Sequence, residues 1–261
     1  MPSSAPPAPW HTNPAQWAAL AQEPHVLGVD GCPHGWVLAL LSLETDAVTL
    51  GFVPHFDKII AHRSAHAKTL RAVVVDMPIG LLDWGRRACE TEARKILKRR
   101  SSSIFACPRR PMLDFETYEQ ANAWGKSGGK DSGGGLSKQA WFLLPKIREI
   151  DDLITPTDQV WLGEGHPEVA FTRVNGAPCS FPKSDSDGLL ERQVLLARAG
   201  LRHLGPQLEA TRSGSPFRHS TDDLLDALIM AVTAKARIDG DAWCFGDDQT
   251  DARGLKMQIW G

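Results

Sequence analysis

The sequence has no long hydrophobic run. No stretch approaches the roughly 18 apolar residues that a membrane-spanning helix needs, and the first basic residue is Lys58, so the basic region of a secretory signal peptide is absent. The five cysteines are odd in number and include no C-x-x-C pair, which excludes the common zinc and dithiol motifs. These absences predict a soluble protein of the reducing cytoplasm that does not contact membranes.

The chain also lacks an excess of charge of either sign. Its 29 basic residues face 31 acidic ones, a formal net charge of −2. No global electrostatic field would therefore attract nucleic acid, and any polyanion site has to be local. The 261 residues, 42% of them hydrophobic, can bury a sizeable core. They leave the oligomeric state open, and a homodimer is compatible with them.

Proline and glycine divide the chain into regions. Six prolines within residues 1–24 predict a flexible tail rich in proline and alanine, with at most a helical turn at Pro14–Ala21. Residues 25–261 are expected to form a single domain. Helical patterns at 86–98 and 138–153 flank a Gly/Ser-rich segment, 125–137, which predicts a helical insertion over about 82–155 with a mobile loop.

Apolar periodicity predicts an α/β fold. Short apolar runs at hairpin spacing indicate three antiparallel strands, followed by alternating helices and strands. The expected strands are 26–30, 36–41, 48–53, 72–76, 160–164 and 256–260. The expected helices outside the insertion are 56–67, 189–204 and 222–236.

Carboxylates stand at the ends of three of the expected strands, and more begin the last long helix. The strand-end acids are Asp30, Asp76 and Glu164, and the helix carries Asp222, Asp223 and Asp226. Because the carboxyl ends of parallel strands gather at one edge of a sheet, these acids can meet in space. Converging carboxylates repel each other unless they bind a cation, and Mg²⁺ or Mn²⁺ prefers oxygen ligands.

Two such ions would stabilise the attacking and leaving oxygens of a phosphodiester displacement. We expect Asp30, Asp76, Asp223 and Asp226 as metal ligands in a nuclease, with Glu164 as an auxiliary ligand or base. Structural alternatives remain for these residues. Asp30 and Asp76 suit strand-to-turn junctions, and Ser220 with Asp223 matches a helix capping box.

Positive charge is concentrated in one part of the expected insertion. Residues 86–110 hold nine basic residues, and Arg87, Arg94 and Lys98 recur at helical spacing. With Arg100, Ser102 and Ser103, they could contact a nucleic-acid backbone without reading its sequence. The alternative is an ordinary solvated helix face. His166 could bind phosphate, although the following Pro167 favours a positioning role at a helix start.

Several motifs in order resemble the family known as domain of unknown function 429, whose members are described as predicted RNase H-like nucleases. The resemblance covers roughly residues 26–260. Its motifs are Gly28-Val29-Asp30-Gly31-Cys32, Gly35-Trp36-Val37, Val75-Asp76-Met77-Pro78-Ile79-Gly80-Leu81, Ser102-Ser103-Ile104-Phe105, Gly135-Leu136-Ser137-Lys138-Gln139, Pro145-Lys146-Ile147-Arg148-Glu149, Glu164-x-His166-Pro167-Glu168-x-x-Phe171 and Asp222-Asp223-Leu224-Leu225-Asp226-Ala227-Leu228.

The resemblance implies a ribonuclease H-like mixed sheet with acids on its first strand, its fourth strand and its last helix. These positions correspond to Asp30, Asp76 and the Asp223-x-x-Asp226 segment. Lys138 and Lys146 of the shared motifs join the candidates for substrate binding. Two other functions stay open: a non-catalytic module that binds nucleic acid or protein, and an actin-like phosphotransferase, which would need a second lobe.

Overall fold

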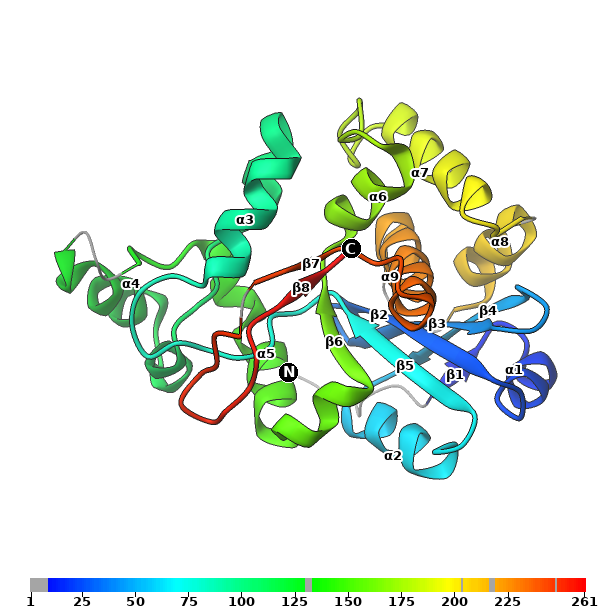
Figure 1. Cartoon of the computed structure of the whole chain (residues 1–261), viewed down its shortest axis with the longest axis horizontal. Helices are drawn as coiled ribbons and strands as arrows, with labels where there is room; N and C mark the ends of the chain where they lie inside the picture. Colours follow the sequence, from blue (N-terminus) through cyan, green and yellow to red (C-terminus); the bar gives the residue numbers. More distant parts are fainter. Residues whose placement is uncertain (1–8, 130–132, 203, 216–218, 247) are drawn as a thin grey trace.

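The computed structural model describes residues 9–129, 133–202, 204–215, 219–246 and 248–261. The described chain is a mixed α/β structure built on one eight-stranded sheet, in the order β1-β4-β3-β2-β5-β6-β8-β7 (Figure 1). The strands are β1 (Trp10–His11), β2 (His25–Cys32), β3 (Gly35–Ser42), β4 (Val48–Val53), β5 (Leu70–Val75), β6 (Leu162–Gly165), β7 (Cys244–Phe245) and β8 (Ile259–Trp260).

The register of the central strands decides which side chains meet. The predicted antiparallel strands are confirmed as β2, β3 and β4, and β5, β6 and β8 then continue the sheet in parallel with β2. Val29 pairs with Val75, which pairs with Glu164. Asp30 directly follows Val29, and Asp76 directly follows Val75. The three strand-end acids therefore lie on neighbouring strands at one edge of the sheet.

Helices cover both faces of the sheet (Figure 1). The α-helices are α1 (Pro14–Leu20), α2 (Asp57–Ala65), α3 (Ala88–Leu97), α4 (Tyr118–Ser127), α5 (Lys138–Leu153), α6 (Pro167–Asn175), α7 (Ser186–Arg198), α8 (Leu204–Gly214) and α9 (Thr221–Asp239). Short 3₁₀ helices are η1 (Lys98–Ser103), η2 (Arg110–Asp114) and η4 (Pro156–Val160). Residues of α6 to α9 form the core on one face, and residues of α1, α2 and α5 form the core on the other.

Helix α9 packs directly on strand β2 because Gly28 has no side chain. A Cβ at Gly28 would lie 2.0 Å from the carbonyl oxygen of Ala227 and 2.1 Å from the amide nitrogen of Ala231. Such distances cannot be met without moving the helix. This contact places the start of α9, which carries Asp226, beside the end of β2, which carries Asp30.

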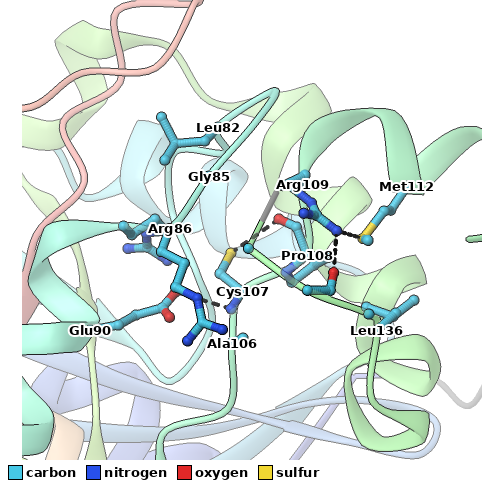
Figure 2. Close-up of a pocket in the computed structure, with 14 residues that line it drawn as sticks. Leu82, Gly85, Arg86, Glu90, Ala106, Cys107, Pro108, Arg109, Met112 and Leu136 are labelled. Carbon is cyan, nitrogen blue, oxygen red and sulfur yellow. Dashed lines mark hydrogen bonds between the residues drawn. The ribbon is translucent and has the colours of Figure 1, made fainter. Parts of the chain in front are cut away.

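The inserted region from α3 to α5 contains its own small core around Met112 and Leu136. Arg109 anchors it: the buried guanidinium lies 5.5 Å from the ring centroid of Trp84 and 5.1 Å from that of Trp124. The same guanidinium donates to the carbonyl of Gly134, and Figure 2 shows it beside Met112 at a small cavity. Two of the nine tryptophans are therefore explained by packing against this cation.

The tail expected over residues 1–24 contains a short strand, β1, and a helix, α1, which lies where a helical turn was predicted at Pro14–Ala21. Trp10 of β1 pairs with Phe52, and Asn13 caps α1 by accepting a hydrogen bond from the amide of Gln16. Trp17 and Leu20 of α1 are buried against the sheet. Burial of one face of α1 and the capping of its first turn thus stabilise the helix despite the many prolines of this segment. Residues 1–8 lie outside the described residues.

Other boundaries also differ from expectation. The helix expected at 189–204 ends at Arg198, where a turn separates α7 from α8. The first part of the Gly/Ser segment, through Ser127, belongs to α4, and residues 130–132 of that segment lie outside the described residues. Val160 ends η4 rather than beginning a strand, and β7 had no clear signal because it is only two residues long.

Candidate active site

A cavity of about 370 Å³ opens at the edge of the sheet where β2, β5 and β6 end. All five predicted catalytic acids line it: Asp30, Asp76, Glu164, Asp223 and Asp226. They come from segments separated by up to 196 residues in sequence, from Asp30 to Asp226. The sheet register and the packing of α9 thus bring together the acids that the sequence singled out.

Four of these acids form what we call the aspartate cluster: Asp30, Asp76, Asp223 and Asp226. Asp30 lies within β2, and Asp76 follows β5 with its amide donating to the carbonyl of Val29 at 2.9 Å. Asp223 accepts a hydrogen bond from the amide of Ser220 at 2.7 Å, so the predicted capping box is present. Asp226, one turn further along α9, is 2% exposed.

Burial and repulsion between carboxylates raise the pKa values of Asp30, Asp76 and Asp226. The pKa of Asp30 is well above its ordinary value, first because the group is buried and then because Asp76 and Asp226 are near. Burial and the charge of Asp226 likewise raise the pKa of Asp76. Burial raises the pKa of Asp226 to about 6, against the opposing effect of Lys183. Carboxyl groups so placed need a positive charge nearby to ionise together.

Lys183 supplies one such charge and was not among the residues predicted for the site. Its Nζ lies 2.8 Å from Oδ2 of Asp226 and 3.0 Å from Oδ2 of Asp222. These two carboxylates raise the pKa of Lys183 although its partial burial opposes them. The residue lies between α6 and α7, where the sequence offers no periodic pattern to mark it.

Glu164 has a guanidinium partner, Arg87, in a buried ion pair. Oε2 of Glu164 also accepts a hydrogen bond from the amide of Ile79 at 2.8 Å. Burial raises the pKa of Glu164 to about 7, although Arg87 and the Ile79 amide both act to lower it. Arg87, a predicted substrate-binding residue, is 2% exposed and lines the cavity, with its Nε and Nη1 atoms buried and without a hydrogen-bond partner.

Glu168 and His166 complete the wall of the cavity beside α6. Glu168 is 7% exposed and forms an ion pair with the fully buried Arg192. His166 caps the start of α6, and its Nε2 lies 3.4 Å from the carbonyl oxygen of Ser103. Burial lowers the pKa of His166 to about 4, so its ring is neutral at physiological pH. The place of His166 at the start of α6 agrees with the positioning role considered for it.

Some of the remaining predicted substrate-binding residues line the cavity, some line a second hollow, and two line neither. Arg100, Ser102 and Ser103 of η1 line the cavity together with the acids. Arg94 and Lys98 line a separate basic hollow, together with Arg86, Thr91, Lys95 and Ser101. Lys138 and Lys146 line neither. Lys138 is exposed at the start of α5, and the Nζ of Lys146 donates to the carbonyl of Gly35 at 2.6 Å.

The donor set of the cavity suits a hard divalent cation, whose ligands are carboxylate oxygens. Oδ1 of Asp226 is buried and has no hydrogen-bond partner, which leaves it available as a ligand. The charge of Asp76 raises the pKa of Asp30, which shows that the two carboxyl groups lie close to each other. In the described part of the chain, however, no three acidic, histidine or cysteine side chains already stand in a metal-ligating arrangement.

The comparisons with known proteins identify the family. The family described as "Protein of unknown function (DUF429)" matches residues 28–251, and the chain belongs to this family. The match runs from Gly28 of β2 to Asp251 near the end, and so includes every acid of the cavity. No curated protein and no solved structure matches the chain.

Among the described helices, none combines the length and the apolar character needed to cross a bilayer.

Proposed function

We propose that this protein is a nuclease that hydrolyses phosphodiester bonds of nucleic acid with the help of a divalent metal ion, Mg²⁺ or Mn²⁺. The observation that carries the proposal is the meeting of Asp30, Asp76, Asp223 and Asp226 in one cavity. The raised pKa values of Asp30, Asp76 and Asp226 indicate buried carboxylates that lack sufficient counter-charge. A bound divalent ion would remove that deficit.

The order of the strands supports a ribonuclease H-like fold for this nuclease. Three antiparallel strands are followed by parallel strands on the far side of the first, in the order β4-β3-β2-β5-β6. Asp30 lies on β2, Asp76 directly follows β5, and Asp223 and Asp226 lie on α9. These are the positions that the resemblance of the sequence motifs implies for the acids. The strand order and the acid positions are independent observations, and they favour the same proposal.

The metal would be held by Asp30, Asp76 and Asp226, with Asp223 beside them. When bound, such an ion lowers the pKa of a water molecule and neutralises charge on a phosphate oxygen. The chain's own residues then bind and orient the substrate. Arg100, Ser102 and Ser103 line the same cavity and offer a guanidinium, hydroxyl groups and amides to the nucleic-acid backbone.

Glu164 has a positioning role in this proposal. Its Oε2 holds both Arg87 and the amide of Ile79, three residues after Asp76. The ion pair therefore fixes the turn that carries Asp76 into the cavity. His166, neutral and hydrogen-bonded to the backbone next to Ser102, similarly holds η1 against the start of α6.

The test is a cleavage assay on single-stranded and duplex DNA and RNA with Mg²⁺ or Mn²⁺. The parent should cleave at least one of these substrates, and chelation of the metal should abolish cleavage. Asp30→Asn and Asp226→Asn keep the shape of the side chain and should each reduce the rate by a factor of at least about 100, the scale expected when transition-state charge stabilisation is lost. Lys58→Gln, at an exposed ion pair with Asp57 outside the cavity, should cleave like the parent.

One observation favours a rival, a non-catalytic module that binds nucleic acid. Lys183 already neutralises part of the charge of Asp226 and Asp222. If the parent binds nucleic acid but cleaves none of the four substrates with either metal, the rival is correct and the nuclease proposal is wrong.

A further inference from the structure

The side chain of Lys183 is 47% exposed, but the backbone that carries it is held in place by its neighbours. The amides of Ser180 and Phe181 donate to the carboxylate of Glu191, at 2.7 and 3.0 Å. On the other side, Gly188 packs so closely that a Cβ there would lie 1.8 Å from the carbonyl oxygen of Pro182. The segment before α7 is thus fixed on both sides of Lys183.

The ammonium of Lys183 forms ion pairs with Asp226 of the aspartate cluster and with Asp222 beside it. It lies 2.8 Å from Asp226 and 3.0 Å from Asp222. Glu90, Glu164 and Glu168, the buried glutamates of the cavity, have guanidinium partners of their own in Arg94, Arg87 and Arg192. Each buried glutamate therefore has its own ion-pair partner, and Lys183 is the ion-pair partner of Asp226 and Asp222.

Lys183 occupies only one side of the Asp226 carboxylate. It contacts Oδ2, whereas Oδ1 is buried, unpartnered and part of a side chain that lines the cavity. The lysine consequently neutralises Asp226 without using up its capacity as a ligand. An ammonium at this distance also repels a second cation that would bind the same Oδ2.

We propose that Lys183 takes the place of a second metal ion, so that the aspartate cluster binds a single divalent cation. This inference rests on the proposed function and refines it, since the acid pattern alone suggested two ions. Lys183 then has two effects. It excludes the second ion from the Asp222 and Asp226 side of the cluster, and its ammonium is positioned to contact a substrate phosphate there.

The test counts the ions that bind, by calorimetric titration of the full-length protein with Mn²⁺ at millimolar concentration. We expect one ion per chain for the parent. Lys183→Met removes the charge and keeps most of the length of the side chain, so this variant should bind two. Lys183→Arg retains the positive charge and should bind one.

The matched control is Lys235→Met, which removes an ammonium that pairs with the exposed Asp46 at 2.6 Å, away from the cavity. It should bind one ion, as the parent does. Two ions in the parent, or one ion in both the parent and Lys183→Met, would overturn the role of Lys183 and leave the metal-dependent nuclease standing. No binding in the parent and in every variant would instead overturn the metal centre itself, and the role of Lys183 with it.

Discussion

Arg87 and Glu164 form a buried ion pair across 77 residues of sequence, with the guanidinium 2% and the carboxylate 6% exposed. Sequence reasoning assigned the arginine to substrate and the glutamate to chemistry. The structure shows that each is the partner of the other. Because Glu164 also binds the amide of Ile79, the pair supports the turn after Asp76.

Arg87→Met should therefore destabilise the protein by about 3–5 kcal/mol, because it leaves the Glu164 charge buried without a partner. The measurement is urea-induced unfolding followed by fluorescence. Adding Glu164→Gln to Arg87→Met removes the stranded charge and should recover most of the loss. Arg212→Met is the control: its ion pair with Glu209 is 3.7 Å long and exposed, and its removal should cost about 1 kcal/mol or less. Equal losses in the two single variants would refute the buried pair.

Gly28→Ala should disturb both stability and the site. A methyl group there would meet the backbone of α9 at about 2 Å, so the helix has to move away from β2. We expect a loss of about 1–3 kcal/mol, the usual cost of overpacking a core. Because α9 carries Asp223 and Asp226, metal-dependent cleavage should fall as well. Gly205→Ala, where a Cβ meets nothing within 4 Å, should preserve both. An unperturbed Gly28→Ala would show that α9 does not lie on β2 as described.

The pKa shifts of the aspartates predict an unusual pH dependence of stability without metal. Asp30, Asp76 and Asp226 have folded pKa values above the unfolded value of about 3.9. Their protonated forms favour folding, so this contribution is complete below that value. It is lost as the pH rises through the folded pKa, which is about 6 for Asp226.

Asp226→Asn should accordingly weaken the fall in unfolding free energy between about pH 4 and pH 7, because the neutral amide no longer releases a proton. The measurement is chemical unfolding in a chelating buffer at several pH values. Saturating Mn²⁺ should also stabilise the parent at neutral pH more than it stabilises Asp226→Asn. Parallel pH profiles for the parent and the variant would contradict the described burial of Asp226.

The basic hollow beside the cavity should bind the nucleic-acid backbone outside the cleavage site. Lys95 and Lys98 are exposed in it, whereas Arg94 already pairs with Glu90 at 3.2 Å. Lys95→Gln with Lys98→Gln should weaken binding of duplexes of any sequence. It should also reduce the slope of log K against log salt by roughly 0.9 for each lost phosphate contact.

The control for the hollow is the pair Lys58→Gln and Lys256→Gln, two lysines with acidic partners elsewhere on the surface. This pair should leave the salt slope unchanged. If both pairs reduce the slope equally, binding follows total charge and the hollow has no special role.

The acids of the site were predictable because each one coincides with a strong local pattern. Asp30 and Asp76 end apolar runs that become β2 and β5, and Asp226 lies beside the apolar stripe of α9. The antiparallel strands and the long helices outside the tail follow from periodicity for the same reason. Two-residue strands such as β1 and β7 carry too few residues for any period to emerge.

The cations of the site depend on tertiary contacts that no local pattern encodes. Arg87 belongs to a dense basic segment, yet its side chain turns inward to Glu164 while Lys95 and Lys98 stay exposed. Lys183 precedes a helix by three residues and resembles any loop lysine until α9 is placed beside it. Arg192 is likewise fully buried within α7, where periodicity alone would allow an exposed position.

The most direct test of the metal centre compares Mn²⁺ binding in the parent and in Asp30→Asn with Asp226→Asn, by calorimetry on correctly folded protein. The account predicts binding at millimolar or lower concentration in the parent and its loss in the double variant. It also predicts that cleavage is lost in parallel. Binding that is equal in both proteins, or absent from the parent, would contradict the account.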